Sequence, residues 1–333
     1  MPPQSSRAIR FHRYGGPDEL GLVDVPMPEP AAGEVRLRVV AAGVNPVECR
    51  IRRGDLASGT PLPAPRGLGT DVAGVVDAVG AGVEELVPGD EVFGRALCDG
   101  YAEHAIAVPS DLIARPAELP WDVAASIAIP GETAFRTLGL LGVVAPAGGT
   151  TVLVHGASGG VGTVAVQLAV LRGARVLGTA GEAHHERLRQ AGVEPVAYGD
   201  GWLERVRALA PDGVDAVLDA AGRGVLPGSI ALAGGPDRVV TIADRRDAGA
   251  LGVTYSRGLV SRVPMAEVFA ELLPALRSGG IVVPVAVHLP LADAARAHRI
   301  SEGGHPGGRI VLTVPSAQPG GIRYTASTPA SSR

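Results

Sequence analysis

The clearest pattern of apolar and polar positions lies near the middle of the chain. A short run of apolar and β-branched residues at 151–154 ends in a group of glycines, and an apolar helical repeat follows at 163–169. This pattern is typical of a buried parallel strand, a tight turn and the helix after it. The sequence therefore predicts a strand–turn–helix unit over residues 151–169.

Strand and helix patterns continue to alternate after this unit. Apolar runs at 175–179, 214–219 and 238–243 predict further strands, and residues 186–190 have the pattern of a helix. Such an alternation predicts an α/β fold with a doubly wound parallel sheet.

The first third of the chain has a different pattern. Short alternating runs separated by Gly/Pro turns are typical of a small all-β unit and predict a β-rich domain over residues 1–120. These runs lie at 34–40, 72–79, 90–94 and 101–108. Helical patterns at 121–129 and 132–141 then begin the α/β part.

The β-like pattern returns near Pro284. Residues 285–287 and 309–314 predict strands, with a helix at 291–298 between them, so we expect the chain to return to its first domain. The tail lacks apolar periodicity and is typical of disorder. The expected organisation is a β-rich domain from 1–120 and 284–314, an α/β domain at 121–283, and a disordered tail at 315–333.

The residues between the central strand and its helix have the chemistry of a phosphate turn. Gly159, Gly160 and Gly162 leave the backbone N–H groups and the positive end of the helix open to a pyrophosphate. The turn departs from the G-x-G-x-x-G spacing because Ala157 stands at the first glycine position, directly after Gly156. One alternative is that these glycines only serve tight turns. The surrounding strands and helices favour a dinucleotide site.

The second strand bears on which dinucleotide binds. In NAD-selective sites an acidic residue about twenty positions past the turn binds the ribose 2′-hydroxyl. Here the strand ends at Thr179 with no carboxylate at its tip, and the first acidic residue is Glu182. More basic than acidic side chains follow, namely His184, His185, Arg187 and Arg189. This favours NADPH, whose 2′-phosphate pairs with cations. A solvated helix start is the alternative interpretation of each of these four side chains.

Composition excludes several classes of function. The 333-residue chain has a net charge of −4 and no basic run, which argues against nucleic acid or an anionic membrane as a partner. All 30 basic side chains are Arg, so chemistry based on a lysine Schiff base is excluded. Cys49 and Cys98 are too few for a disulfide framework or a cysteine-based zinc site, and no leader or membrane-spanning run is evident. We expect a cytoplasmic protein.

Several ordered motifs carry a resemblance to a known family. The chain from about residue 7 to 314 resembles the zinc-independent, zeta-crystallin-like quinone oxidoreductases of the medium-chain dehydrogenase/reductase superfamily. The motifs are AAGVNPVE at 41–48, GTDVAGVV at 69–76, VPGDEVFG at 87–94, GYAE at 100–103 and GETAF at 131–135.

The resemblance implies a fold, a cofactor and a set of site residues. It implies a GroES-like substrate domain from both chain ends, a Rossmann domain between them, NADPH in the cleft and a homodimer. Thr133 is implied to lie beside the nicotinamide, and Tyr198 near the adenosine phosphate. The pyrophosphate is implied to bind the turn formed by Ala157, Ser158, Gly159, Gly160, Val161 and Gly162.

The same comparison bears on metal. Where zinc alcohol dehydrogenases of the superfamily have a Cys ligand and a His-Glu pair, this chain has Asn45, Thr70 and Asp71, and the four-cysteine lobe is missing. No three-ligand catalytic zinc cluster is predicted. Without a Lewis acid, the expected reaction is reduction of a quinone or an α,β-unsaturated carbonyl, because hydride transfer to either leaves a phenolate or enolate that conjugation stabilises.

Three residues are candidates for chemistry on the acceptor. Asn45 lies in a matched motif and its amide can donate to a carbonyl, although it also suits a turn. Arg50 and Leu56 replace the tyrosines of several quinone reductases; Arg50 is a donor to an oxyanion or a partner of a surface carboxylate. Tyr101 either reaches the cleft or is architectural. Water is a further possible proton source.

The sequence thus predicts an NADPH-dependent, metal-independent reductase of a small quinone or enone. Two alternatives stay open. One is an enoyl reductase or tailoring enzyme of polyketide-type biosynthesis, because the two tyrosine positions have changed. The other is an NADPH-binding protein with a non-redox role as a sensor, scaffold or cyclase.

Overall fold

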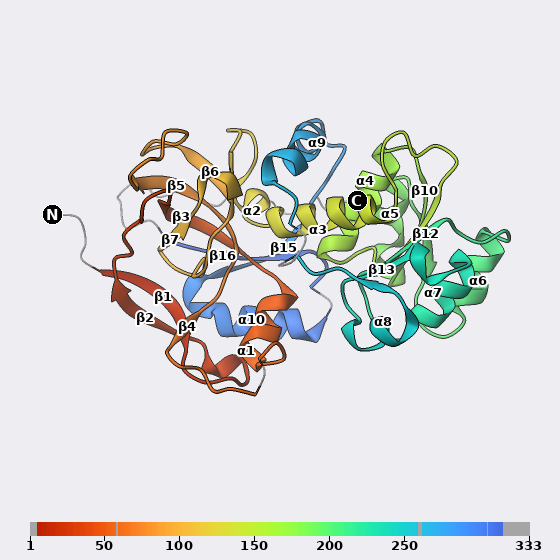
Figure 1. The fold of residues 1–333 in the computed structure, drawn as a ribbon, viewed down its shortest axis with the longest axis horizontal. Helices are drawn as coiled ribbons and strands as arrows, with labels where there is room; N and C mark the ends of the chain where they lie inside the picture. The colour runs from red at the N-terminus through yellow and green to blue at the C-terminus, as the bar shows by residue number, and fades with distance from the viewer. Residues whose placement is uncertain (1–4, 58, 259–261, 305, 316–333) are drawn as a thin grey trace, which may run out of the picture.

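The computed structural model describes residues 5–57, 59–258, 262–304 and 306–315. The chain forms two lobes joined through a shared middle layer (Figure 1). The predicted tail lies outside the described residues, apart from Pro315.

One lobe contains a six-stranded parallel sheet in the order β11-β10-β9-β12-β13-β14. Its strands are β9 (Thr151–His155), β10 (Arg175–Ala180), β11 (Glu194–Ala197), β12 (Ala216–Asp219), β13 (Val239–Thr241) and β14 (Thr254–Tyr255). Its helices are α3 (Ala128–Leu140), α4 (Gly160–Leu171), α5 (His185–Gln190), α6 (Trp202–Leu209), α7 (Leu226–Ala233), α8 (Arg245–Leu251) and α9 (Met265–Ser278). This order of parallel strands is that of a Rossmann fold, so the predicted doubly wound sheet is confirmed.

The other lobe is built on a seven-stranded sheet, in which β15-β16-β3-β5-β6-β8 are ordered neighbours and β7 pairs with β3. The strands are β3 (Val35–Val44), β5 (Asp71–Val79), β6 (Glu91–Arg95), β7 (His104–Ala107), β8 (Leu112–Ala114), β15 (Val285–Pro290) and β16 (Arg309–Thr313). A second sheet, ordered β2-β1-β4, contains β1 (Ser5–Phe11), β2 (Gly21–Pro26) and β4 (Arg66–Gly67). The α-helices of this part are α1 (Pro46–Arg53), α2 (Trp121–Ala124) and α10 (Ala294–Gly303).

The last strand joins the two ends of the chain. β16 pairs antiparallel with β3, with Ile310 opposite Val44 and Val311 opposite Gly43. The late segments β15, α10 and β16 therefore lie against the first lobe, as the blue ribbon in Figure 1 shows. Short 3-10 helices lie at Pro17–Glu19, Pro109–Asp111, Glu182–His184, Pro236–Arg238 and Leu291–Asp293.

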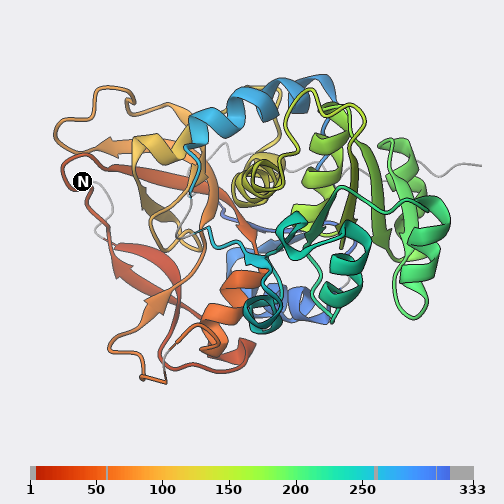
Figure 2. The ribbon, with the colours of Figure 1, turned by 45° about the vertical axis from the view of Figure 1, so that its right-hand side comes forward.

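The lobes share an apolar core around α3. Ala41, Ala73 and Phe93 of the first lobe belong to the same buried cluster as Val152 and Leu168 of the second. Phe93 of β6 also meets Phe269 of α9 edge to face, with ring centroids 5.0 Å apart. Figure 2 shows α3 end-on between the two lobes. Burial of this apolar surface fixes how the lobes face each other.

Two local features differ from the sequence prediction. The first lobe is not all-β, because α1 follows β3 directly; Asn45 caps it, Pro46 occupies its first turn and Glu48 completes a capping box. The helix predicted at 121–129 is broken: α2 ends at Ala124 and α3 begins at Ala128. The restart places Pro130 in a first turn, where its missing N–H needs no partner.

Candidate functional site

The phosphate turn connects β9 to α4 and needs glycine at two places. Gly156 has a φ of +75°, and a Cβ at Gly162 would overlap the carbonyl of Gly156. Gly159 is the extended cap of α4, and the methyl of Ala157 is fully buried. The turn therefore directs the free N–H groups of a twelve-residue helix into the space between the lobes.

A buried hydrogen-bond chain supports this turn from behind. The Ser229 hydroxyl donates to the Val225 carbonyl at 2.8 Å, so it accepts from Nε2 of His155 at 3.1 Å. Nδ1 of His155 then accepts from the Thr179 hydroxyl at 3.2 Å, and Thr179 Oγ1 accepts from the N–H of Gly156 at 3.3 Å. The Thr179 hydroxyl is thus engaged inside the lobe, behind the turn.

His155 makes the stability of this lobe depend on pH, and a variant without the imidazole isolates its contribution. Burial lowers the pKa of His155 from 6.5 to about 3, so the folded protein keeps this ring neutral where the unfolded chain protonates it. We expect the free energy of unfolding to fall on acidification from about pH 6.5 toward pH 3, more in the wild type than in His155→Leu. Urea titrations of both proteins across this range measure the difference. If the difference in the free energy of unfolding between the wild type and His155→Leu does not vary with pH, His155 is not the group responsible.

The cationic candidates lie around the same edge of the sheet. Arg187 donates to the carbonyls of Gly307 at 2.9 Å and Ser158 at 3.5 Å, and no described carboxylate forms an ion pair with it. His185 is half-buried, with Nε2 3.2 Å from the Ala180 carbonyl. Tyr198 is exposed, and the guanidinium carbon of Arg223 lies 6.0 Å from its ring centroid. Positive charge thus adjoins the turn and the end of β10.

A buried polar cluster lies in the other lobe, next to the turn. Arg309, the first residue of β16, donates from Nη2 to Asn45 Oδ1 at 2.8 Å and Asp71 Oδ2 at 3.3 Å. Asn45 Nδ2 donates to Asp71 Oδ2 at 3.1 Å. Glu48 accepts from the Tyr101 hydroxyl at 3.1 Å and from the N–H of Thr70 at 3.2 Å. We call Asn45, Glu48, Asp71, Tyr101 and Arg309 the buried polar cluster.

Burial dominates the electrostatics of this cluster. It raises the pKa of Glu48 from 4.5 to about 7 and that of Asp71 from 3.8 to about 6, although Arg309 partly opposes the effect at Asp71. The pKa of Tyr101 is raised well above its usual range by burial and by Glu48. One guanidinium therefore faces two carboxyl groups that titrate near neutral pH.

The structure brings together two of the three predicted catalytic residues. Asn45 and Tyr101 both contact Glu48, but both are buried and engaged in hydrogen bonds. Arg50 is half-buried on α1, and no side-chain hydrogen bond of it is found in the described chain. Arg50 is thus the one of the three with free donors, while Tyr101 has the surroundings of a structural residue.

Thr133 lies on α3, between the lobes, next to a buried ion pair. Its neighbour Glu132 accepts from Arg136 Nε at 2.8 Å, and Arg136 also donates to Ser256 Oγ. Glu132 further accepts from the N–H of Val263 at 3.3 Å, in the segment that leads to α9. The ion pair ties α3 to the end of β14 and to that segment, so it fixes the part of α3 that carries Thr133.

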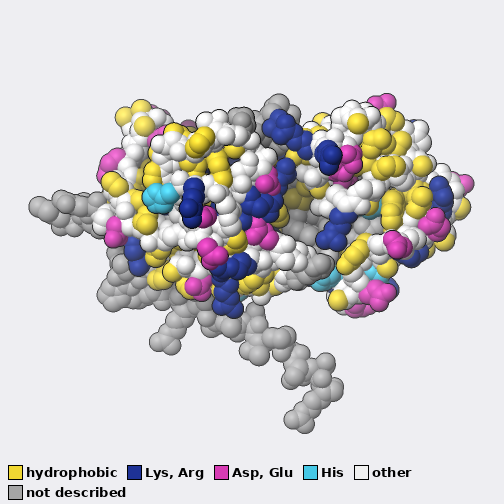
Figure 3. All heavy atoms as spheres, turned by 90° about the horizontal axis from the view of Figure 1, so that it is seen from below, with side chains coloured by type: hydrophobic (Ala, Val, Ile, Leu, Met, Phe, Trp, Pro, Cys, Tyr) yellow, Lys and Arg dark blue, Asp and Glu magenta, His cyan; other side chains and the backbone are white. Residues whose placement is uncertain are grey.

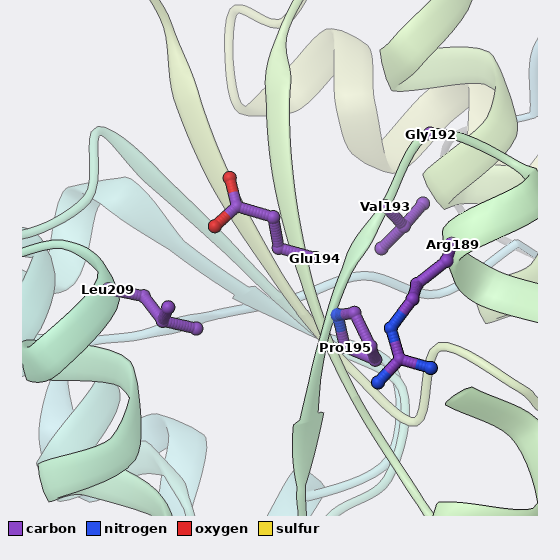
Figure 4. A pocket seen from close by; sticks show the side chains of 6 residues that line it. All are labelled: Arg189, Gly192, Val193, Glu194, Pro195 and Leu209. Atoms are coloured by element: carbon purple, nitrogen blue, oxygen red, sulfur yellow. The ribbon is translucent and has the colours of Figure 1, made fainter. Parts of the chain in front are cut away.

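One hollow of the surface lies away from the phosphate turn and the buried polar cluster. A shallow depression of about 400 Å³ is lined by residues of α5, β11 and the end of α6 (Figure 4). Its residues are Arg189, Gly192, Val193, Glu194, Pro195 and Leu209. It lies at the start of β11, whereas dinucleotides bind beyond the carboxyl ends of parallel strands. A small enclosed gap between the turn and β16 is lined by Gly159, Gly160, Thr163, Pro284 and Arg309.

One face of the molecule shows the cleft directly. In Figure 3 the surface is hollowed between the two lobes, and arginine side chains lie on both sides of the hollow.

In the described ranges, no three His, Cys, Asp or Glu side chains gather as metal ligands do. Among the described helices, none is long and apolar enough to span a membrane.

Sequence reasoning missed Arg309; it noted Glu48 only within the motif at 41–48, and Asp71 only as the residue at a zinc-ligand position of related enzymes. Arg309 follows Gly307 and Gly308 and opens an apolar strand. A Cβ at Gly308 would approach the Pro284 carbonyl to 2.5 Å, so glycine there permits the close approach that buries Arg309. An arginine at the start of a buried strand after two glycines was the available signal.

A Rossmann lobe with a glycine turn and a β-rich lobe from both chain ends define a dinucleotide-dependent oxidoreductase of two domains. Residues 31–114 match the family model described as alcohol dehydrogenase GroES-like domain, and residues 191–312 match that of zinc-binding dehydrogenase. A quinone oxidoreductase of Rattus norvegicus is 34% identical over 327 residues, covering 92% of this chain and 97% of its own.

Two further relatives extend the comparison. The crystal structure of Escherichia coli quinone oxidoreductase complexed with NADPH superimposes with a TM-score of 0.80 at 27% identity, covering 92% of this chain and 99% of the other. The spectinabilin polyketide synthase system protein NorB of Streptomyces orinoci is 35% identical over 339 residues, covering 95% of this chain and 15% of NorB. The chain belongs to the quinone oxidoreductase family of the medium-chain dehydrogenase/reductase superfamily. The predicted family, fold and oxidoreductase class are confirmed.

Proposed function

We propose that this protein is an NADPH-dependent, metal-independent reductase of a small quinone or α,β-unsaturated carbonyl. The observation that carries the proposal is Arg187, a cation that contacts the phosphate turn through the Ser158 carbonyl and pairs with no carboxylate in the described structure. An unneutralised cation beside a phosphate turn suits a cofactor with an additional phosphate. The relatives named quinone oxidoreductase support the same reaction.

The residues present fit NADPH. The turn from Ala157 to Gly162 and the N-terminus of α4 suit the pyrophosphate, and Arg187, His185 and Tyr198 lie where we propose the adenosine phosphate binds. Thr179 is engaged with His155, and Ala180 follows it, so no carboxylate at the end of β10 repels a 2′-phosphate. Bound NADPH supplies the hydride.

The chain's own residues orient the acceptor and stabilise the charge that develops on it. We propose Thr133 on α3 as the residue beside the nicotinamide, held by the Glu132–Arg136 pair. Arg50 has free donors for an oxyanion, and Asn45 acts as a positioning residue because its amide already bridges Asp71 and Arg309. Asn45, Thr70 and Asp71 offer a poor ligand set for catalytic zinc, which supports a reaction without metal.

A stopped-flow trace of nicotinamide absorbance tests the proposal. NADPH and NADH are each mixed with the protein and a panel of ortho-quinones, para-quinones and conjugated enones. The expected result is consumption of NADPH in preference to NADH with at least one acceptor. Binding of NADPH without consumption by any of them refutes the quinone reductase proposal.

Arg187 offers a direct test of cofactor selectivity. We expect Arg187→Gln to weaken NADPH binding by roughly 10- to 100-fold, because a hydrogen bond to a charged group contributes about 1.5–3 kcal/mol. NADH binding is expected to change much less. Fluorescence titration of the wild type and the variant with NADPH and with NADH measures the two dissociation constants and their ratio. Arg189→Gln is the matched control, since Arg189 lies on the same helix and its side chain bonds Glu186 instead. If NADPH and NADH lose affinity equally, Arg187 does not bind the 2′-phosphate.

The similarity to NorB favours a second candidate, reduction of an enoyl intermediate in polyketide-type biosynthesis. Adding enoyl thioesters to the acceptor panel separates it from the first, because a specialised reductase consumes NADPH with these and not with quinones. A non-redox role predicts tight NADPH binding with no consumption by either group.

We also propose a cytoplasmic homodimer with no nucleic-acid or membrane partner. Cys49 and Cys98 are both free thiols, which suits a reducing compartment. Light scattering of the purified chain, with a dimer mass as the expected result, tests the assembly.

A further inference from the structure

Arg309 is the member of the buried polar cluster that lies next to the phosphate turn. Its guanidinium is buried, and a Cβ added at Gly160 would lie 2.7 Å from Nη1. Nη2 bonds Asn45 and Asp71, while Nε is buried with no hydrogen-bond partner in the described structure. A cation with an unpartnered N–H thus adjoins the N-terminus of α4, which is where an anion binds.

More buried acidic groups than basic groups surround Arg309. Asp71 and Glu48 face it as two buried carboxyl groups, joined through the amide of Asn45. Asp71 also accepts from the N–H of Ile129 at 2.7 Å, and Glu48 from Tyr101 and Thr70. The other nearby cation, Arg95, is paired with Asp111 at 2.8 Å. Among the described residues, Arg309 is therefore the guanidinium that pairs with Asp71, and it also attracts Glu48.

We propose that Arg309 exchanges partners when a dinucleotide binds, from Asn45 and Asp71 to the pyrophosphate, and that Glu48 and Asp71 together take up one proton from solvent. The proposal rests on the proposed function, because it needs a dinucleotide in the cleft. The pyrophosphate brings two negative charges beside a buried guanidinium that has a free N–H. Once the guanidinium turns to it, two buried carboxylates lose their counter-charge, and one of them is neutralised by the incoming proton.

The exchange has a defined pH window. At pH 8 both carboxyl groups of the free protein are largely ionised, because the pKa values of Glu48 and Asp71 lie at about 7 and about 6. Uptake of about one proton is then expected. Near pH 5 both groups are already protonated, so they take up almost no proton on binding. Above pH 7, where the 2′-phosphate stays a dianion, NADPH affinity is expected to fall as the pH rises.

Calorimetric titration of the full-length protein with NADPH at pH 8, in buffers of different ionisation enthalpy, measures the proton stoichiometry. At this pH the 2′-phosphate is already a dianion, since its second pKa is near 6, and it contributes no proton. We expect uptake approaching one proton in the wild type and near zero in Asp71→Asn, whose amide keeps the shape of the side chain. Asp212→Asn, at an exposed position before β12, is the matched control and is expected to keep the wild-type uptake.

The outcomes are distinct. NADPH binding without proton uptake overturns the exchange and leaves the proposed function intact, whereas no NADPH binding overturns both. Undiminished uptake in Asp71→Asn also overturns the exchange. If Asp71→Asn does not fold, infrared difference spectra of the wild type decide instead: NADPH must produce the band of a newly protonated carboxyl group, and its absence overturns the proposal.

Discussion

Replacing Gly160 by valine is expected to abolish NADPH binding. Gly160 is the first residue of α4, and even a methyl carbon there would lie 2.7 Å from Nη1 of Arg309. A branched side chain would also cover the N–H groups that the turn offers to a pyrophosphate. Loss of two hydrogen bonds to a charged group, at about 1.5–3 kcal/mol each, lowers affinity by more than roughly 100-fold.

Fluorescence titration of the variant with NADPH measures this effect, with circular dichroism to show that the fold is kept. Gly139→Val is the matched control, because Gly139 is exposed near the end of α3 and a Cβ there meets nothing within 4 Å. Near-normal affinity in a folded Gly160→Val protein contradicts the assignment of the turn.

Breaking the Glu132–Arg136 pair is expected to give the largest loss of stability. The two side chains are only 2% and 4% exposed, so Arg136→Met leaves a buried carboxylate without its cation. Removal of one partner from a buried ion pair lowers the free energy of unfolding by about 3–5 kcal/mol. Ser256 also loses a hydrogen-bond partner, which loosens the contact between α3 and the end of β14.

A double-mutant cycle separates the two causes of this loss. Adding Glu132→Leu to Arg136→Met removes the unpaired charge, so the double variant is expected to be more stable than Arg136→Met alone. Arg189→Met is the control: its pair with Glu186 has side chains 58% and 72% exposed, and its removal is expected to change stability by less than about 0.5 kcal/mol. Urea unfolding is measured for the wild type, Arg136→Met, Glu132→Leu, the double variant and the Arg189→Met control. A double variant no more stable than Arg136→Met rejects the buried-charge explanation.

The Rossmann lobe was predictable from sequence because its signals are local. The apolar run at 151–154, the glycines after it and the spacing to the next strand each follow from the needs of a parallel sheet. Helix α1 was predictable too, from a capping box with Asn45, Pro46 and Glu48, but the alternating strands around it favoured an all-β interpretation.

The buried polar cluster could not be predicted in the same way. Its members come from α1 and its N-cap, from β5 and β16, and from the loop that carries Tyr101, at positions as far apart as Asn45 and Arg309. No periodicity links residues that meet only through the pairing of the first and last strands of a sheet. The hydroxyl of Tyr101 likewise has a partner, Glu48, that tertiary structure alone supplies.

That pairing of distant strands also orders events during synthesis of the chain. The parallel sheet has all six strands by Tyr255, whereas the other sheet lacks β16 until Thr313 has been made. Domains fold as units while translation proceeds. The cofactor lobe can therefore form before β16, the last neighbour of β3, has been synthesised, and Arg309 enters the cleft only after all six strands of that lobe have been made.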